Sequence, residues 1–226
     1  MKKYTVEDFF NKKFEIESTR VLNETPSFFS SSLVKDYVGD IMSYGLNEYI
    51  QYIIENPIQT EITSRDITQL SSIADCTCNM CEVMIECNNR GLTLTEIAKG
   101  LHADNNYKDN PVALTKYGEN QAKTAQQFGL VIYSKDLWYL TAIGNIFPEL
   151  STAFQNKYLS IVLLRDPFYS QIIISLIEKD TNIKDYMSIL SVTTQKRRTS
   201  SCNRTLSFFL KQCDMEGVKL HNLLTK

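Results

Sequence analysis

Two clusters of polar and basic side chains have the residue types that contact nucleic acid. In the first, basic and hydroxyl residues precede apolar Leu206 and Phe209. A polar start and an apolar end are typical of a recognition helix, whose first turns reach the DNA while its last turns pack in the domain. Arginine can donate two hydrogen bonds to guanine, and lysine, serine and threonine can bind phosphate oxygens. We therefore expect DNA contacts from Thr194, Gln195, Lys196, Arg197, Arg198, Ser200, Ser201 and Arg204.

The second cluster lies on a predicted helix over residues 111–128 and at a turn after it. Asn110 and Pro111 supply an N-cap and a first-turn proline, and Gly129 is placed to end the helix in a left-handed conformation. The predicted outer side carries hydroxyls, amides and lysines, although a solvated helix without a ligand has a similar composition. DNA contacts are expected from Thr115, Lys116, Glu119, Asn120, Lys123 and, at the turn, Lys135.

Four of the six cysteines fall between residues 76 and 87 and raise the question of a zinc site. Four thiolates can hold zinc, but no second Cys-x-x-Cys pair supports such a site. The alternative is a helix over residues 72–88 in which cysteine acts as a small apolar residue. We favour the helix and expect no metal, and the sequence leaves open whether zinc is bound by Cys76, Cys78, Cys81 and Cys87.

A nuclease would need carboxylates positioned for Mg²⁺, usually with a nearby lysine. No such motif stands out, and there is no glycine-rich phosphate loop. The catalytic residues therefore stay unassigned, and no cofactor is expected unless the chain is a nuclease that uses Mg²⁺. In that case the ligands would be sought among Asp36, Asp40, Glu48 and Glu55.

The second cluster is positioned by elements predicted in the order helix, turn, helix, hairpin, helix. Thr93 and Glu96 form a capping box that starts a helix over 93–101. Two strands, 130–133 and 137–140, enclose a turn, and Thr141 is placed to cap the next helix. This order builds a winged helix-turn-helix in which the hairpin is the wing.

Helical periodicity also covers most of the remaining chain. Helices are expected over 6–14, 32–44 and 46–55, and later over 150–164, 168–179, 181–190 and 195–213. The fold class is therefore mainly α, a tandem winged helix-turn-helix with one small β-hairpin wing and an N-terminal helical region. The expected domains are residues 1–72 for packing or dimerisation, 73–148 as the winged unit, and 149–226 as a second, degenerate helix-turn-helix.

Composition places the chain among globular proteins. Of its 226 residues, 43% are hydrophobic and 22% charged, and the net charge is −2. A chain that is not basic as a whole differs from many non-specific nucleic-acid binders, but residues 192–226 hold seven basic and two acidic side chains. Since there is no long apolar run and no signal peptide, we expect a cytoplasmic protein without a membrane partner.

Two segments resemble a known family. The run from Tyr117 to Leu130, YGENQAKTAQQFGL, and the later WYLTAIG ending at Gly144 are similar to the DNA-recognition region of FokI-like type IIS restriction endonucleases and related restriction-system proteins. The resemblance covers residues 74–147 and implies DNA binding in a restriction-modification or phage-defence system. No counterpart of the cleavage domain of those enzymes is found, so enzymatic activity is left open.

Together these observations predict sequence-specific binding of double-stranded DNA. Contacts to DNA phosphates are expected from Lys116, Lys123, Lys196 and Arg204. Contacts to base edges are expected from Thr115, Asn120, Arg197 and Arg198. Two alternatives remain: a compact type II restriction endonuclease with a diverged Mg²⁺ site, and a plasmid or phage replication initiator or transcription regulator. Besides DNA, the partner to consider is a second copy of the chain, in a homodimer, or a separate nuclease subunit.

Overall fold

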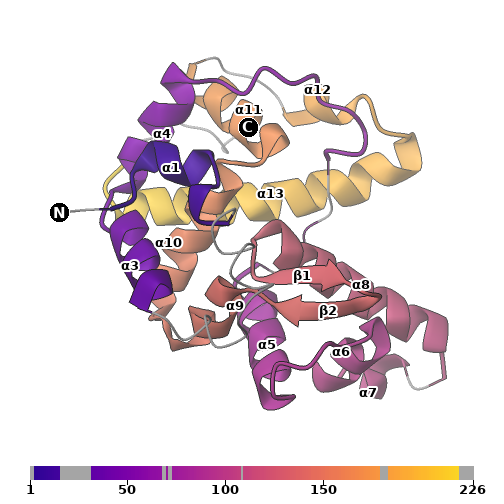
Figure 1. The fold of residues 1–226 in the computed structure, drawn as a ribbon. Coiled ribbons are helices and arrows are strands. Elements are labelled where there is room, and N and C mark those ends of the chain that lie inside the picture. Colours follow the sequence, from indigo (N-terminus) through magenta and orange to yellow (C-terminus); the bar gives the residue numbers. More distant parts are fainter. Residues whose placement is uncertain are drawn as a thin grey trace. The chain divides into compact units, whose positions relative to one another are not determined.

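The structure, a computed structural model, describes residues 3–15, 32–67, 70, 73–107, 109–178 and 183–218, apart from the side chains at 74–76 and 178. The described part is helical apart from one two-stranded antiparallel sheet and the connecting segments (Figure 1). The prediction of a mainly α fold with one small hairpin is confirmed.

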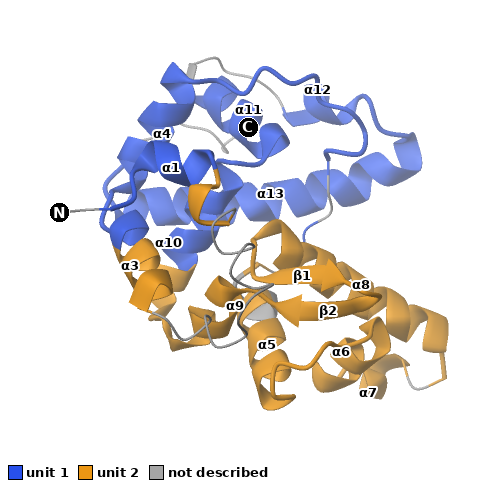
Figure 2. Cartoon of the chain, in the orientation of Figure 1, with its two compact units in different colours: residues 1–11, 40–70, 156–226 blue, residues 12–39, 71–155 orange. Residues whose placement is uncertain are grey.

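The chain divides into two compact units (Figure 2). Unit 1 comprises Met1–Asn11, Asp40–Leu70 and Asn156–Lys226, and unit 2 comprises Lys12–Gly39 and Ser71–Gln155. The sequence predicts three domains with boundaries after residues 72 and 148. That division remains a prediction.

Unit 2 contains the segment predicted as helix, turn, helix, hairpin and helix. The cysteine-rich segment is helical, as favoured above, although residue 72 and the side chain of Cys76 lie outside the described residues. The elements in chain order are α5 (Ile73–Glu86), α6 (Leu94–Gly100), α7 (Asp104–Tyr107), α8 (Pro111–Gln127), β1 (Val131–Ser134), β2 (Leu137–Leu140), α9 (Ala142–Ile146) and the 3₁₀ turn η2 (Phe147–Glu149). Unit 2 also contains most of α3 (Ser32–Met42) and the start of α10 (Thr152–Leu163).

Helices α6 and α8 pack unusually close together because α8 has a glycine at the contact. The predicted capping box is present: Glu96 Oε2 accepts a hydrogen bond from the Thr93 backbone N–H at 2.8 Å, and Thr93 Oγ1 accepts one from Glu96 N–H at 3.3 Å. A Cβ atom added at Gly118 would lie 2.0 Å from the carbonyl oxygen of Leu94. The first turn of α6 therefore rests directly on the backbone of α8.

The hairpin is confirmed, but its first strand lies one residue later than the predicted 130–133. Val131 pairs with Leu140 and Ser134 with Leu137, so only Lys135 and Asp136 lie in the turn. Both have positive φ, +48° and +63°, as the central residues of a type I′ turn do. Leu92 extends the sheet by one bridge, with backbone hydrogen bonds of 2.9 Å in both directions to Trp138. Trp138 is 5% exposed and therefore belongs to the core of unit 2.

One helix in this region was not predicted. Residues 104–107 form the short helix α7, and Tyr107 packs on Tyr117 with ring centroids 5.9 Å apart. On α8, helical spacing predicts a buried Val112 and an exposed Thr124. The structure has the reverse: Val112, in the first turn, is 79% exposed, and Thr124 is buried and donates a hydrogen bond to the carbonyl oxygen of Asn120.

Unit 1 is built entirely of helices among the described residues. These are α1 (Val6–Phe10), α4 (Leu46–Glu55), α11 (Pro167–Glu178), α12 (Ile183–Met187) and α13 (Val192–Met215), with the end of α3 and most of α10. The core includes Phe9 packed edge-on against Tyr49 at 5.4 Å. Helix α13 has 24 residues and is about 36 Å long. Its inner side buries Leu206 and Phe209.

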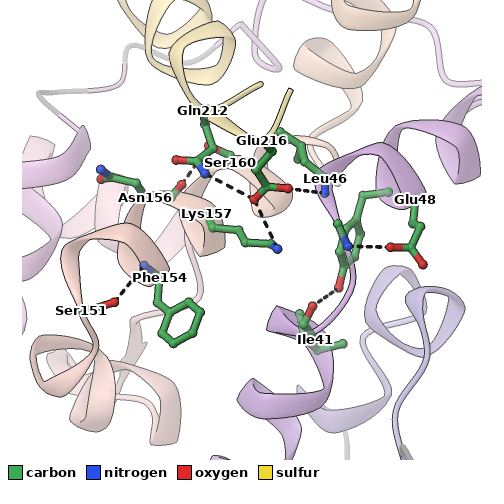
Figure 3. Close-up of polar contacts among 12 residues, drawn as sticks. Ile41, Leu46, Glu48, Ser151, Phe154, Asn156, Lys157, Ser160, Gln212 and Glu216 are labelled. Atoms are coloured by element: carbon green, nitrogen blue, oxygen red, sulfur yellow. Dashed lines mark hydrogen bonds and ion pairs between the residues drawn. The ribbon is translucent and has the colours of Figure 1, made fainter. Parts of the chain in front are cut away.

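A polar junction joins three helices of unit 1 at the end of α13 (Figure 3). The carboxylate of Glu216 accepts a hydrogen bond from the N–H of Leu46, at the start of α4, at 2.7 Å, and lies 3.2 Å from the ammonium of Lys157 in α10. The side chains of Lys157 and Glu216 are only 14% and 20% exposed. The junction therefore places a largely buried charge pair between α4, α10 and α13.

Replacing Glu216 by alanine should destabilise unit 1 by about 2 kcal/mol, because it leaves a buried ammonium and a backbone N–H without their acceptor. Glu216→Gln should cost less, since its amide oxygen can still accept from Leu46. Urea unfolding measures both values, with exposed Asp214→Ala as the control. Equal stability of Glu216→Ala and Asp214→Ala would contradict the role of the junction.

No single helix among the described residues is long and apolar enough to cross a membrane. Helices α10 and α11 reach that length and composition only as a pair, bent by 91° at their junction.

Candidate nucleic-acid interface

Three elements of unit 2 surround an open hollow of about 550 Å³. Its lining residues come from the start of α6, from α8 and from the hairpin. We call this surface the hollow face. It is lined by Thr93, Leu94, Thr95, Thr115, Glu119, Lys123, Gln126, Tyr133, Asp136 and Trp138. Thr115, Glu119 and Lys123 were predicted from the sequence as DNA contacts, and the structure brings them together here.

Local hydrogen bonds fix the hydroxyl-bearing part of the hollow face. The hydroxyls of Thr95 and Thr115 are hydrogen-bonded at 3.0 Å, which ties the first turn of α6 to α8. Thr115 Oγ1 also donates to the carbonyl oxygen of Pro111 at 2.9 Å. Thr93, Thr95 and Gln126 were not predicted as site residues. Their place on this surface depends on how α6 crosses α8, which no local pattern gives.

The charges on α8 form a compact triad. The carboxylate of Glu119 lies 2.6 Å from the ammonium of Lys116 and 2.5 Å from that of Lys123. Hydrogen bonds from the two lysines hold the pKa of Glu119 below its usual value, so the carboxylate stays ionised. Both lysines are more than 60% exposed. The triad therefore carries one net positive charge and keeps both ammonium groups at the surface.

The tip of the hairpin presents a lysine in a conformation that costs energy. Lys135 has φ +48°, a left-handed conformation that glycine or asparagine adopts more readily. Its side chain is exposed, as is that of Asn120 on α8. The two-residue turn of the hairpin requires a positive φ at both of its central positions. Lys135 and Asn120 lie where the sequence placed them, on exposed parts of unit 2.

The capping box of α6 makes the stability of the fold sensitive to acid. Hydrogen bonds from the Thr93 backbone N–H, from Arg90 and from the Thr93 hydroxyl hold the pKa of Glu96 at about 2, below its usual 4.5. A carboxylate whose pKa is lower in the folded state stabilises the fold fully above its unfolded pKa. This stabilisation is lost as the pH falls from about 4.5 to about 2.

Glu96→Gln should therefore reduce the loss of stability over this pH range, because the amide does not titrate. The free energy of unfolding, measured against pH in urea, provides the test. Glu55→Gln, which removes an exposed carboxylate from α4, is the control. If Glu96→Gln follows the same pH profile as the wild type, the capping box does not contribute as described.

The structure separates the predicted contacts of α13 into exposed and inward-facing side chains. Lys196, Arg197, Ser200 and Arg204 are exposed. Thr194 and Gln195 are half-buried in the first turn, where Gln195 Nε2 donates to the carbonyl oxygen of Leu190 at 2.9 Å.

Arg198 and Ser201 do not lie where base contacts would require them. Arg198 donates a hydrogen bond from Nη1 to the carbonyl oxygen of Ile67, and burial lowers the pKa of its guanidinium. Ser201 is 1% exposed and donates to the carbonyl oxygen of Leu70 at 2.8 Å. These two side chains attach the segment before α5 to α13. We therefore correct the expectation for both and leave them out of any DNA-contacting surface.

The four carboxylates considered for Mg²⁺ do not gather into a site among the described residues. Asp40 accepts hydrogen bonds from the backbone N–H groups of Lys3 and Tyr4, and Glu48 accepts one from Gly45. Asp36 and Glu55 are exposed on α3 and α4. No group of three or more acidic, histidine or cysteine side chains suited to a metal occurs in the part of the chain that the structure describes.

The described cysteines are poor nucleophiles where they are buried. Burial raises the pKa of the Cys202 and Cys213 thiols to about 12 and raises that of Cys81 as well.

Comparison with family models, characterised proteins and solved structures found no match for this chain.

Proposed function

We propose that this protein binds double-stranded DNA in a sequence-specific manner through the hollow face of unit 2, folded as a winged helix-turn-helix. The observation that carries the proposal is the convergence of α6, α8 and the hairpin on one concave surface with hydroxyl, amide, carboxylate and ammonium groups. The order α5, α6, α8, β1, β2, with Leu92 paired to Trp138, supports the winged helix-turn-helix assignment.

In this proposal α8 enters the major groove, which is wide enough for one helix. Lys116, Lys123 and Lys135 contact phosphates on either side of the groove. Asn120 and Thr115 reach base edges. Glu119 accepts from an exocyclic amino group of cytosine or adenine, because a carboxylate is purely an acceptor.

The biological setting is part of the proposal and depends on sequence resemblance. Residues 74–147 resemble the DNA-recognition region of FokI-like endonucleases, and on that ground we propose a role in a restriction-modification or phage-defence system. A second copy of the chain, or a separate nuclease subunit, would complete such a system. The function assigned to the chain itself is binding.

The proposal is tested by titrating the full chain against fluorescent duplexes at several salt concentrations. We expect affinity to fall steeply with salt, because each phosphate contact releases counterions from the DNA. Absence of binding at low salt would contradict the proposal. Equal affinity for all duplexes would reject sequence recognition while leaving DNA binding in place.

A further inference from the structure

We propose that the exposed side of α13 is a second nucleic-acid surface, which binds the phosphate backbone of duplex DNA without reading its sequence. This surface, the α13 stripe, is defined by Lys196, Arg197, Arg204 and Lys211. It goes beyond the proposed function because it lies in unit 1, whereas the hollow face belongs to unit 2.

Helical spacing places the cations of the α13 stripe on one side. Arg197, Arg204 and Lys211 recur every seven residues, which is about two helical turns, and Lys196 precedes the first of them. All four side chains are exposed. From Lys196 to Lys211 the stripe extends about 22 Å along the helix. It is therefore an elongated cationic ridge, a shape suited to a strand of phosphates.

Helix α13 itself carries no acidic residue along the stripe. The exposed positions between the cations are Ser200, Asn203 and Ser207, and the first acidic side chain of α13 is Asp214, after Lys211. No ion pair joins the four cations to a carboxylate among the described residues. This contrasts with α8, where Glu119 neutralises one of two lysines. The stripe keeps its full charge for an external anion.

The side chains of the stripe favour phosphates over bases. Arg198, which comes directly after Arg197, points inward and donates a hydrogen bond to the carbonyl oxygen of Ile67. Ser201 is buried. The remaining neutral groups are short hydroxyls and one amide. Contacts of this kind fix a protein on the duplex and carry no sequence information directly.

The apolar side of α13 argues against an anionic membrane as the partner. A helix that lies on a membrane inserts its apolar face between the lipids. In α13 that face is already covered, because Cys202, Leu206, Phe209 and Cys213 are each 1% exposed. Hydrogen bonds of Ser201 and the Glu216 junction hold the helix in unit 1. Only the charged side remains available, so the ligand must be recognised by charge.

The test compares pairs of charge-removing substitutions in the full chain. The stripe variants are Lys196→Ala/Arg197→Ala and Arg204→Ala/Lys211→Ala, and alanine preserves the helix at exposed positions. The control is Lys12→Asn/Lys35→Ala, which removes two exposed lysines elsewhere and keeps a residue tolerant of the positive φ at position 12. Far-UV circular dichroism and melting temperature confirm that each variant is folded.

Binding to two fluorescent duplexes of unrelated sequence is measured against salt. Each stripe variant should lower the slope of log affinity against log salt by about two, and by the same amount for both duplexes. The control should leave the slope unchanged, apart from a small uniform effect of net charge.

Three outcomes would overturn the inference. They are an unchanged slope in both stripe variants, a loss confined to one of the two duplexes, and a loss of binding to anionic phospholipid vesicles while duplex binding is intact. If the stripe variants bind normally but Lys116→Ala/Lys123→Ala binds weakly, the proposed function stands and the inference about α13 fails.

Discussion

Replacing Gly118 by alanine should destabilise unit 2 by about 3 kcal/mol, because overpacking against backbone atoms cannot be relieved by a side-chain movement. The added Cβ would lie 2.0 Å from the carbonyl oxygen of Leu94 and 2.9 Å from its carbon. Helix α6 would have to move away from α8. That movement would also separate the hydroxyls of Thr95 and Thr115, so DNA affinity should fall with stability.

A matched control exists in the same chain. Gly39 lies inside helix α3, and a Cβ added there has no atom within 4 Å. Gly39→Ala should therefore stabilise the protein by roughly 0.5–1 kcal/mol, the usual gain of alanine over glycine in a helix. Urea unfolding of both variants measures the difference. If Gly118→Ala unfolds at the wild-type midpoint, α6 and α8 do not pack as described.

The second large effect is expected from Lys116→Ala/Lys123→Ala, which should weaken duplex binding roughly 100-fold at low salt. Two charge-assisted contacts are lost, each contributing about 1.5 kcal/mol, and about 1.4 kcal/mol is a factor of ten. The substitution also leaves Glu119 without its two partners. The net charge of the triad then changes from positive to negative, which repels phosphate.

Glu119→Gln makes the net charge of the same triad more positive, so it is the matched variant with the opposite charge change. It removes the carboxylate and leaves two free ammonium groups, so affinity for arbitrary duplexes should rise and its salt dependence should steepen. Preference for a particular base at the position of Glu119 should weaken. Salt titrations of the three proteins measure these effects together. Affinity changes of the same sign in both variants would contradict the charge model of the hollow face.

The local part of the fold could be predicted because short-range chemistry determines it. Asn110 caps α8 by accepting from Ala113 N–H at 2.9 Å, and Gly129 adopts φ +71° after the helix, as its position predicts. The capping box of Thr93 and the presence of the hairpin follow from residues within a few positions of each other, although β1 lies one residue later than predicted. Helix α4 has the predicted bounds for the same reason.

The parts that could not be predicted depend on contacts between distant residues. Arg197 and Arg198 are neighbours in sequence, yet one is exposed and the other donates to a carbonyl 131 residues away. No local pattern distinguishes the two. The same applies to Glu216, whose partner Leu46 is 170 residues away. The role of Gly118 depends on where α6 crosses α8, which no local pattern gives.

The most direct test of sequence-specific DNA binding by the hollow face is selection of bound duplexes from a random pool by the full chain. The account predicts a short enriched motif for the wild-type protein. It also predicts that Glu119→Gln and Asn120→Ala each change the preference at one position of that motif, while Lys35→Ala leaves it intact. Recovery of unenriched sequences by the wild-type protein, or an unchanged motif in both hollow-face variants, would contradict it.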